Sequence, residues 1–356
     1  MRQKIGSTLW HHRPTSLSRP FPQPLPSLQT VLTKATAVSS CRALTNNSPS
    51  STSIPTLQRT CRVYNITGGV VPYDQAWLWQ QRLLHERIAW QRETPTPPVG
   101  HDVLLLLEHP SVYTLGRGSS LDHLRFDPSD PACRDEVRRT ERGGEVTWHG
   151  PGQIVGYPVM DLNYHKKDLH WYLRQLEEVL IRVLALHGLE GERETEHTGV
   201  WVGGAKIAAI GLNASRWITS HGFALNVNPE MQPFESIVPC GIQGRPVTRL
   251  FDLVPPEGIA VGSGGGGGDS GGGATASAAD AGGGAGGAVD SVRSHAIREF
   301  GDIFGLKMEI EEVDAEAGAG GDLEGRLFPS ACDPALLARL RAESRRQLEL
   351  TARRRV

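Results

Sequence analysis

The stretch Arg142-Gly-Gly-Glu-Val-Thr-Trp-His-Gly-Pro-Gly-Gln153 places four glycines among an arginine, a threonine and a histidine. Apolar residues alternate with other residues on both sides of its Gly-Pro-Gly turn, which predicts two strands within residues 145–162. Because glycine has no side chain, the stretch would also let a ligand lie directly against backbone N–H groups. Glycines of this kind are equally common in plain hairpins. The stretch alone therefore predicts a strand–turn–strand unit and leaves its function open.

A second short stretch, Val238-Pro-Cys-Gly-Ile242, holds one thiol between a proline and a glycine. That setting suits an exposed and rigidly held nucleophile, although a lone cysteine is also a common small core residue. The five cysteines of the chain are scattered and include no Cys-x-x-Cys pair. This pattern argues against a disulfide framework and against a cysteine-based zinc site. Cys240 is therefore a candidate nucleophile.

Hydrophobic periodicity predicts further strands and helices along the chain. Strands are expected at residues 63–66, 102–108, 112–115, 218–228 and 306–313, with a hairpin over 198–212 that turns at 203–204. Helices are expected at residues 73–90, from a cap at 168 to 187, at 292–304 and at 334–354, with a loop over 121–138. Together these elements predict a domain that contains both strands and helices.

Two segments lack the composition of a folded domain. Residues 1–61 are basic and rich in serine, threonine and proline, and the first acidic residue of the chain is Asp74. This is typical of a transit peptide, with a disordered tail as the alternative. Residues 262–287 are almost wholly Gly, Ala, Ser and Asp, which indicates a flexible insertion. We expect one folded domain over 62–313, followed over 314–356 by a loop and a basic, solvated C-terminal helix.

The overall charge excludes some partners. The formal net charge of the 356-residue chain is −2, which gives no bulk attraction to nucleic acid or to a membrane surface. No run of residues is long and apolar enough to span a bilayer. We therefore expect no nucleic-acid partner and no membrane span.

Lys206 lies in Gly203-Gly-Ala-Lys-Ile-Ala-Ala-Ile-Gly211, among small and apolar residues. This is not a phosphate-binding loop, because Ala205 precedes the lysine and Ile207 replaces the required serine or threonine. An ammonium in such surroundings loses hydration, which lowers its pKa and can make it a base. Since thiolate is the nucleophilic form of cysteine, Cys240 and Lys206 make a chemically sensible pair. An ordinary strand lysine that points to water is the alternative.

Four stretches together resemble the lipoyl(octanoyl) transferase family: residues 142–153, 204–211, 221–226 and 239–242. They occur in the order that the family has. The resemblance implies an α/β (α+β) fold with mixed sheets flanked by helices, as in a biotin/lipoate protein ligase-like catalytic domain. It also implies that the protein moves an octanoyl group from octanoyl-acyl carrier protein to a lysine of a lipoyl domain. Such acceptors are the glycine-cleavage H protein and the E2 subunit of 2-oxoacid dehydrogenases. The resemblance implies neither a cofactor nor a metal.

The resemblance also assigns roles to individual residues. Cys240 would carry the acyl-thioester, and Lys206 would lower the pKa of its thiol. The substrate-binding residues would be Arg142, Gly143, Gly144, Glu145, Val146, Thr147, Trp148, His149, Ala209, Ile210, Gly211, Gly222, Phe223 and Ala224.

An eight-carbon chain also needs an apolar tunnel, for which Val146, Ala208, Ala209, Ile210 and Phe223 are candidates. Backbone N–H groups near the glycines could hold the oxyanion of each acyl transfer.

Two histidines of these stretches have open roles. His149 is a candidate either to orient groups and donate to the thioester carbonyl, or to serve as a satisfied structural histidine. His221 is interpreted as structural.

Three other functions remain open at this point. An ATP-dependent lipoate or biotin ligase on the same fold would not need Cys240 as a nucleophile. A cysteine hydrolase would normally pair its cysteine with a histidine and an Asn or Asp, whereas the matched partner here is Lys206. A catalytically inactive module that binds lipoyl domains would not need either residue.

The acid-free basic start predicts import into an organelle, and we expect the mitochondrial form, located in the matrix. Import should remove an N-terminal segment, so N-terminal sequencing of the native protein should begin downstream of Met1. Intact Met1 on protein purified from cytosol would contradict this expectation.

Overall fold

The computed structural model describes residues 59–93, 102–128, 136–238, 245–255 and 285–316, together with 130, 325, 335–336, 338–340 and 342. The predicted transit peptide and most of the Gly-rich insertion therefore lie outside the described residues. So does the stretch around Cys240, together with most of the predicted C-terminal helix. The few described residues between 325 and 342 are helical.

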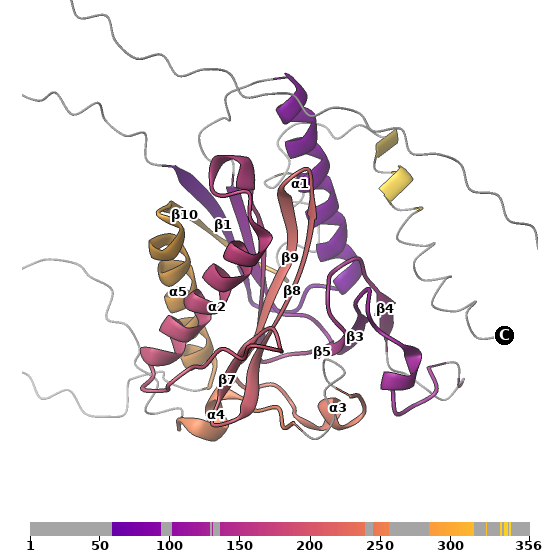
Figure 1. The fold of residues 1–356 in the computed structure, drawn as a ribbon, viewed down its shortest axis with the longest axis vertical. Coiled ribbons are helices and arrows are strands. Elements are labelled where there is room, and N and C mark those ends of the chain that lie inside the picture. Colours follow the sequence, from indigo (N-terminus) through magenta and orange to yellow (C-terminus); the bar gives the residue numbers. More distant parts are fainter. Residues whose placement is uncertain are drawn as a thin grey trace, which may run out of the picture. The chain divides into compact units, whose positions relative to one another are not determined.

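The larger sheet has seven strands in the order β10-β1-β2-β6-β9-β8-β7 (Figure 1). Its strands are β1 (Thr60–Thr67), β2 (Asp102–Leu107), β6 (Gln153–Val159), β7 (Val200–Val202), β8 (Ala205–Ser215), β9 (Ile218–Asn226) and β10 (Lys307–Asp314). β1 pairs in parallel with β10 and β2, whereas β2, β6, β9, β8 and β7 pair antiparallel in turn. The predicted mixed sheet is confirmed.

The smaller sheet has three strands in the order β4-β3-β5. They are β3 (Val112–Leu115), β4 (Val137–Arg139) and β5 (Val146–His149). β3 pairs in parallel with β4 and antiparallel with β5, which places Thr114 opposite Thr147 and Val112 opposite His149. This register brings the glycine-rich stretch that follows residue 142 alongside β3.

Helices cover both faces of the larger sheet because alternate strand side chains point to opposite faces. Val63 and Leu104 pack with α2 (Leu169–Ala185) and α5 (Ala285–Phe304) on one face. Tyr64 and Leu105 pack with α1 (Tyr73–Glu93) on the other. The short helices are η1 (Leu121–His123), η2 (Leu162–Tyr164), α3 (Gln232–Glu235) and α4 (Leu250–Leu253). Within the described residues, no helix has the length and apolarity needed to cross a membrane.

The predicted helix that begins after Asp168 is confirmed. The side chain of Asp168 accepts a hydrogen bond from the backbone N–H of Trp171, which caps the first turn. The helix ends at Ala185, and Gly188 adopts a φ of +72°, a left-handed conformation that glycine reaches without strain.

Several element boundaries differ from the predictions because tertiary pairing extends or adds elements. β1 begins at Thr60, where it pairs with Lys307 of β10, so the folded domain starts two residues before the predicted boundary. Helix α5 begins at Ala285, so the predicted insertion over 262–287 overlaps its first turn. The predicted loop over 121–138 contains η1 and the start of β4. The polar β4 has no apolar alternation and forms because it pairs with β3.

Leu180→Ala should lower the free energy of unfolding by about 2–5 kcal/mol, because it removes buried methyl groups from the contact between α2 and the larger sheet. Urea denaturation followed by circular dichroism measures the change. Arg182→Ala is the control, because Arg182 is about half exposed on the same helix and should shift stability by roughly 0.5 kcal/mol or less. Equal effects of the two variants would contradict the assigned orientation of α2.

Candidate active site

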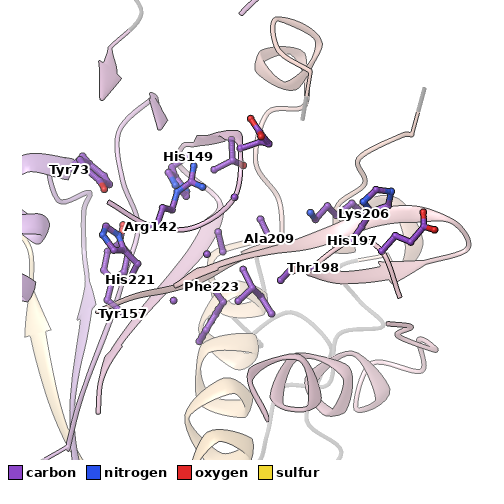
Figure 2. Close-up of a pocket in the computed structure, with 18 residues that line it drawn as sticks. Tyr73, Arg142, His149, Tyr157, His197, Thr198, Lys206, Ala209, His221 and Phe223 are labelled. Atoms are coloured by element: carbon purple, nitrogen blue, oxygen red, sulfur yellow. The ribbon is translucent and has the colours of Figure 1, made fainter. Parts of the chain in front are cut away.

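A cavity of about 170 Å³ lies along β8 and β9 and is closed by β5, β6 and the start of α1 (Figure 2). Its walls come from six separate parts of the chain. They are Tyr73 of α1; Arg142, Gly144, Glu145, Thr147 and His149 in and before β5; Tyr157 of β6; Glu196, His197 and Thr198 before β7; Lys206, Ala209, Ile210 and Gly211 of β8; and His221, Gly222, Phe223 and Ala224 of β9.

The cavity has two different ends (Figure 2). Lys206, His197 and Thr198 lie at one end, while Tyr73, Tyr157 and His221 lie at the other. Ala209 and Phe223 lie between them, so the middle of the cavity is apolar. A cavity with a lysine at one end and an apolar centre can hold a hydrocarbon chain whose reactive end lies near the lysine.

The predicted substrate-binding residues line this cavity, except Gly143, Val146 and Trp148. The exceptions in β5 follow from strand alternation: Thr147 and His149 face the cavity, whereas Val146 and Trp148 face the core of the smaller sheet. The Trp148 ring packs edge-on against Phe234, with ring centroids 5.3 Å apart. The structure therefore does not place Val146 in the proposed acyl tunnel.

Ala208 and Cys240 are two further residues of the predicted site. Ala208 packs in the main core and lines a small second cavity beside Lys206 instead of the larger one. Cys240 lies outside the described residues.

The lining also includes residues that the sequence did not indicate, namely Tyr73, Tyr157, Glu196, His197 and Thr198. From the sequence, Tyr73 was only the first residue of the helix expected over 73–90. His221, interpreted as structural, also lines the cavity. The missed residues lie outside the glycine-rich stretches, so no local pattern marks them, and only the packing of α1 and β6 against β9 brings two of them to the cavity.

Arg142 fixes the wall next to β3. Its Nη2 donates to the carbonyl oxygen of Thr114 at 2.7 Å and to the Thr114 hydroxyl oxygen at 2.9 Å. The backbone N–H of Gly143 donates to the carbonyl of Leu212 at 2.8 Å. A Cβ at Gly211 would lie 2.9 Å from Arg142 Cδ, so glycine is required where β8 passes the arginine. Gly211 thus allows the backbone of β8 to lie close to the backbone at Gly143 and to the buried Arg142 side chain.

His149 is held by hydrogen bonds on both ring nitrogens. Its Nδ1 lies 2.6 Å from Gln153 Oε1 and its Nε2 lies 3.2 Å from the Thr114 hydroxyl. Gln153 Nε2 donates to Asn226 Oδ1 at 2.8 Å, so Gln153 Oε1 is the acceptor and His149 Nδ1 carries the proton. The Thr114 hydroxyl then donates to His149 Nε2. Both nitrogens are engaged, which matches the satisfied structural alternative for this histidine and leaves no N–H for a thioester carbonyl.

Burial keeps this histidine neutral. Burial first, and the neighbouring His109 second, lower the pKa of His149 to about 3. Burial likewise lowers the pKa of His109 to about 4. His109 Nδ1 donates to the carbonyl of Val71 at 2.6 Å, and its Nε2 accepts from the Tyr157 hydroxyl at 2.7 Å. The two rings are therefore neutral parts of the wall at neutral pH.

Lys206 is buried at the opposite end, with 6% of its surface exposed. Its Nζ lies 5.3 Å from the ring centroid of Trp201, which is a cation–π distance. Gly199 has a φ of +131°, and a Cβ there would lie 2.6 Å from Lys206 Cε. The glycine therefore makes room for the lysine side chain. The alternative of a strand lysine that points to water is not what the structure shows.

Both flanks of the stretch around Cys240 are anchored beside the cavity. On the N-terminal side, the backbone N–H of Val238 donates to the carbonyl of His123 at 2.8 Å. On the C-terminal side, Lys206 N–H donates to the Pro246 carbonyl and the Thr248 N–H donates to the Lys206 carbonyl, each at 2.9 Å. The chain that follows the cysteine is thus bound to the backbone of Lys206 itself.

The depressed histidine pKa values predict a loss of stability in mild acid. An unfolded histidine has a pKa near 6.5, so below that pH the unfolded chain binds protons that buried His109 and His149 do not. Stability is full above about pH 6.5 and falls toward about pH 3–4. Lowering the pH from 7 to 5 should reduce the free energy of unfolding by roughly 2 kcal/mol for each of these two rings.

Urea denaturation at pH 7 and pH 5 measures this loss. His149→Gln should lose less stability between the two pH values than the unsubstituted chain. His170→Gln, at an exposed position of α2, should behave like the unsubstituted chain. The same loss at pH 5 in all three proteins would contradict the assignment.

Comparison with known proteins identifies the family. Residues 72–261 match the lipoyl protein ligase A/B catalytic domain. An octanoyltransferase of Nostoc sp. (strain PCC 7120) is 47% identical over 251 residues, which are 70% of this chain and 95% of that protein. An octanoyltransferase of Synechococcus elongatus is 58% identical over 190 residues, which are 53% of this chain and 78% of that protein.

Solved structures share the fold at much lower identity. A lipoate-protein ligase A bound with ATP aligns with a TM-score of 0.52 at 13% identity, over 77% of this chain and 95% of that chain. A bipartite lipoate protein ligase from Thermoplasma acidophilum aligns with a TM-score of 0.50 at 14% identity, over 77% of this chain and 93% of that chain. These two likenesses concern the fold alone. The family match and the close relatives show that the chain belongs to the lipoyl protein ligase A/B catalytic domain family, on its octanoyltransferase branch.

Proposed function

We propose that this octanoyltransferase moves the octanoyl group from octanoyl-acyl carrier protein to Cys240 and then to a lysine of a lipoyl domain. The observation that carries the proposal is the cavity with an apolar centre and Lys206 at one end. The segment that follows Cys240 is hydrogen-bonded to the backbone of that lysine. Because described residues on both sides of Cys240 are anchored near this lysine, we pair Cys240 with Lys206 in the reaction.

The centre of the cavity supplies the acyl site. Ala209, Ile210, Phe223 and Ala224 line it with apolar groups. The Phe223 ring lies over Gly156 of β6, where any Cβ would collide with the ring. The small residues and the glycine leave a narrow space, and burying a hydrocarbon chain there is favourable by about 0.8 kcal/mol for each CH₂.

The first acyl transfer forms the enzyme thioester. The Cys240 thiolate attacks the carbonyl carbon of the octanoyl thioester, the new C–S bond forms, and the carrier-protein thiolate leaves. Lys206, buried at this end of the cavity, takes the thiol proton as a neutral amine. The ammonium that results favours the thiolate beside it and then returns the proton to the leaving carrier thiolate. Donor and intermediate are both thioesters, so the step needs no ATP.

The second acyl transfer forms the product amide. The acceptor lysine amine attacks the Cys240 thioester, the C–N bond forms, and the Cys240 thiolate leaves. Lys206 removes the proton that the attacking amine loses and passes it to the Cys240 thiolate. Each step passes through a tetrahedral oxyanion, and backbone N–H groups in the glycine-rich walls are the proposed donors to it. The amide is more stable than a thioester, so the reaction runs toward the acceptor.

The proposed partners follow from this chemistry. The donor is octanoyl-acyl carrier protein, and the acceptors are lipoyl domains such as those of the glycine-cleavage H protein and the E2 subunit of 2-oxoacid dehydrogenases. A mitochondrial matrix location is also a proposal. The octanoyltransferases compared above are cyanobacterial, which gives no support to a mitochondrial address in particular. Fluorescence microscopy of the tagged full chain would distinguish mitochondrion, plastid and cytosol.

The alternative functions are less well supported. The two ligases compared above share the fold at 13% and 14% identity, whereas the octanoyltransferases reach 47% and 58%. A cysteine hydrolase would normally pair its cysteine with a histidine, whereas the segment that follows Cys240 is hydrogen-bonded to the backbone of Lys206, and both ring nitrogens of His149 are engaged. One result would distinguish an inactive binding module from a transferase. In an inactive module, Cys240→Ala would leave the only activity, which is lipoyl-domain binding, unchanged.

Substitution of Cys240 and Lys206 tests the mechanism. Cys240→Ala should abolish both the octanoyl mass on the enzyme and the product. Lys206→Ala should slow enzyme acylation by about 10²–10⁴-fold, and higher pH should restore part of the rate by forming thiolate without the lysine. Lys206→Arg should also be slow, because a guanidinium does not give up its proton. Intact-mass analysis of the acylated enzyme as a function of time and pH measures each rate.

Matched variants serve as controls for this series. Lys307→Ala removes an exposed strand lysine and should leave the acylation rate unchanged. Cys133→Ala and Cys332→Ala should keep the octanoyl mass on the enzyme. Full activity of Lys206→Ala, or octanoyl attached to Cys133 or Cys332, would overturn the mechanism.

A further inference from the structure

The end of the cavity far from Lys206 carries buried polar atoms with unused hydrogen-bonding capacity. Tyr73 is 5% exposed, His221 is 2% exposed, and both line the cavity. The Tyr73 hydroxyl, His221 Nε2 and Glu141 Oε2 have no hydrogen-bond partner among the described residues. Groups of this kind are normally satisfied by ordered water or by a ligand.

The neighbouring structure holds these groups in place. Glu141 Oε1 accepts hydrogen bonds from Trp77 Nε1 at 2.8 Å and from Gln81 Nε2 at 3.0 Å, both on α1. The backbone N–H of His221 donates to Gln80 Oε1 at 2.8 Å, and His221 has a φ of +58°. His221 Nε2 lies 3.6 Å from Glu141 Oε2, too far for a hydrogen bond. The strained backbone of His221 is therefore fixed by α1 with its ring at the cavity end.

Other polar groups at this end are already paired. The Tyr157 hydroxyl donates to His109, and both ring nitrogens of His149 are engaged. Tyr73 is a neutral donor at neutral pH, because burial, followed by the nearby Tyr157 and Glu141, raises the pKa of its hydroxyl. Tyr73 and His221 are thus the cavity-lining groups that can still bind a molecule here.

The length of the cavity places these groups beyond an eight-carbon chain. Lys206 and Gly211 of β8 both line it, and five residues of strand extend about 16 Å. An extended octanoyl chain has seven C–C bonds of roughly 1.5 Å and spans about 9 Å in its zigzag. With its carbonyl near Lys206, an octanoyl chain fills the apolar centre and ends several ångströms short of Tyr73 and His221. Two further carbons add only about 2.5 Å, whereas an extended tetradecanoyl chain spans about 16 Å and reaches these two groups.

We propose that Tyr73 and His221 set the upper limit of the acyl chain, by binding water that a longer hydrocarbon chain must displace. This inference rests on the proposed function. A methyl group cannot replace the hydrogen bonds of the displaced water, so Tyr73 and His221 would be left buried and unpaired. A chain that ends in a hydroxyl group would replace those bonds and be accepted. The polar end therefore acts as a specificity determinant for unsubstituted medium-length chains.

The test compares three donors, namely octanoyl-, tetradecanoyl- and 14-hydroxytetradecanoyl-acyl carrier protein, with the full chain and a lipoyl domain. The kcat/KM of each donor is measured by intact mass of the acylated lipoyl domain. The unsubstituted enzyme should use 14-hydroxytetradecanoyl about tenfold better than tetradecanoyl, the value expected for one buried unpaired group. Tyr73→Phe should raise the tetradecanoyl-to-octanoyl ratio of kcat/KM by a similar factor.

Tyr113→Phe is the matched control. It removes a buried tyrosine hydroxyl that donates to the Pro233 carbonyl at 3.2 Å, away from the cavity, and should leave the ratio unchanged. The inference is overturned if tetradecanoyl and 14-hydroxytetradecanoyl are used equally well, or if Tyr73→Phe and Tyr113→Phe give the same ratio. Neither result would affect octanoyl transfer by the unsubstituted enzyme, whereas a failure of the proposed function would remove that transfer itself.

Discussion

One chain of hydrogen bonds joins the smaller sheet to the larger one and ends beside Lys206. It runs from the Arg142 guanidinium through the Thr114 hydroxyl, the His149 ring and the Gln153 amide to Asn226. Each member donates in the same direction, so the bonds polarise one another. In a buried network a missing member leaves its neighbours unpaired, which is costly. The geometry of the cavity wall therefore depends on all members being present together.

The last step of this chain reaches the Lys206 end of the cavity. Asn226 Nδ2 donates to the carbonyl of Thr248 at 3.0 Å. The backbone N–H of Thr248 in turn donates to the carbonyl of Lys206. The same residues that shape the cavity wall thus also anchor the segment that follows Cys240. In this arrangement the polar network has a positioning role at the end of the cavity where we propose that the acyl transfers take place.

The fold and the chemistry are separable in this family. Ligases with a similar fold align over about three quarters of this chain at 13–14% identity, and shared architecture at that level does not fix a reaction. The reaction is therefore argued from the site of this chain. Here a buried lysine faces the cavity with Trp201 beside it and Gly199 beneath it. The polar end near Tyr73 adds a second local feature that can change substrate choice without changing the fold.

The sequence by itself determined the strands other than β4 and the main helices, and its resemblance to a known family indicated most of the cavity lining. Side-chain alternation and helical periodicity are local, so β8, β9 and α2 could be predicted from their own residues, and the glycine-rich stretches marked Arg142 and Lys206. Only the tertiary structure decided which side chains of β5 face the cavity. It also decided that both nitrogens of His149 are occupied and that α1 supplies Tyr73. The physical reason is distance along the chain: Arg142 meets a partner 28 residues away and Gln153 one 73 residues away. Pairings of that range leave no periodic trace in the sequence.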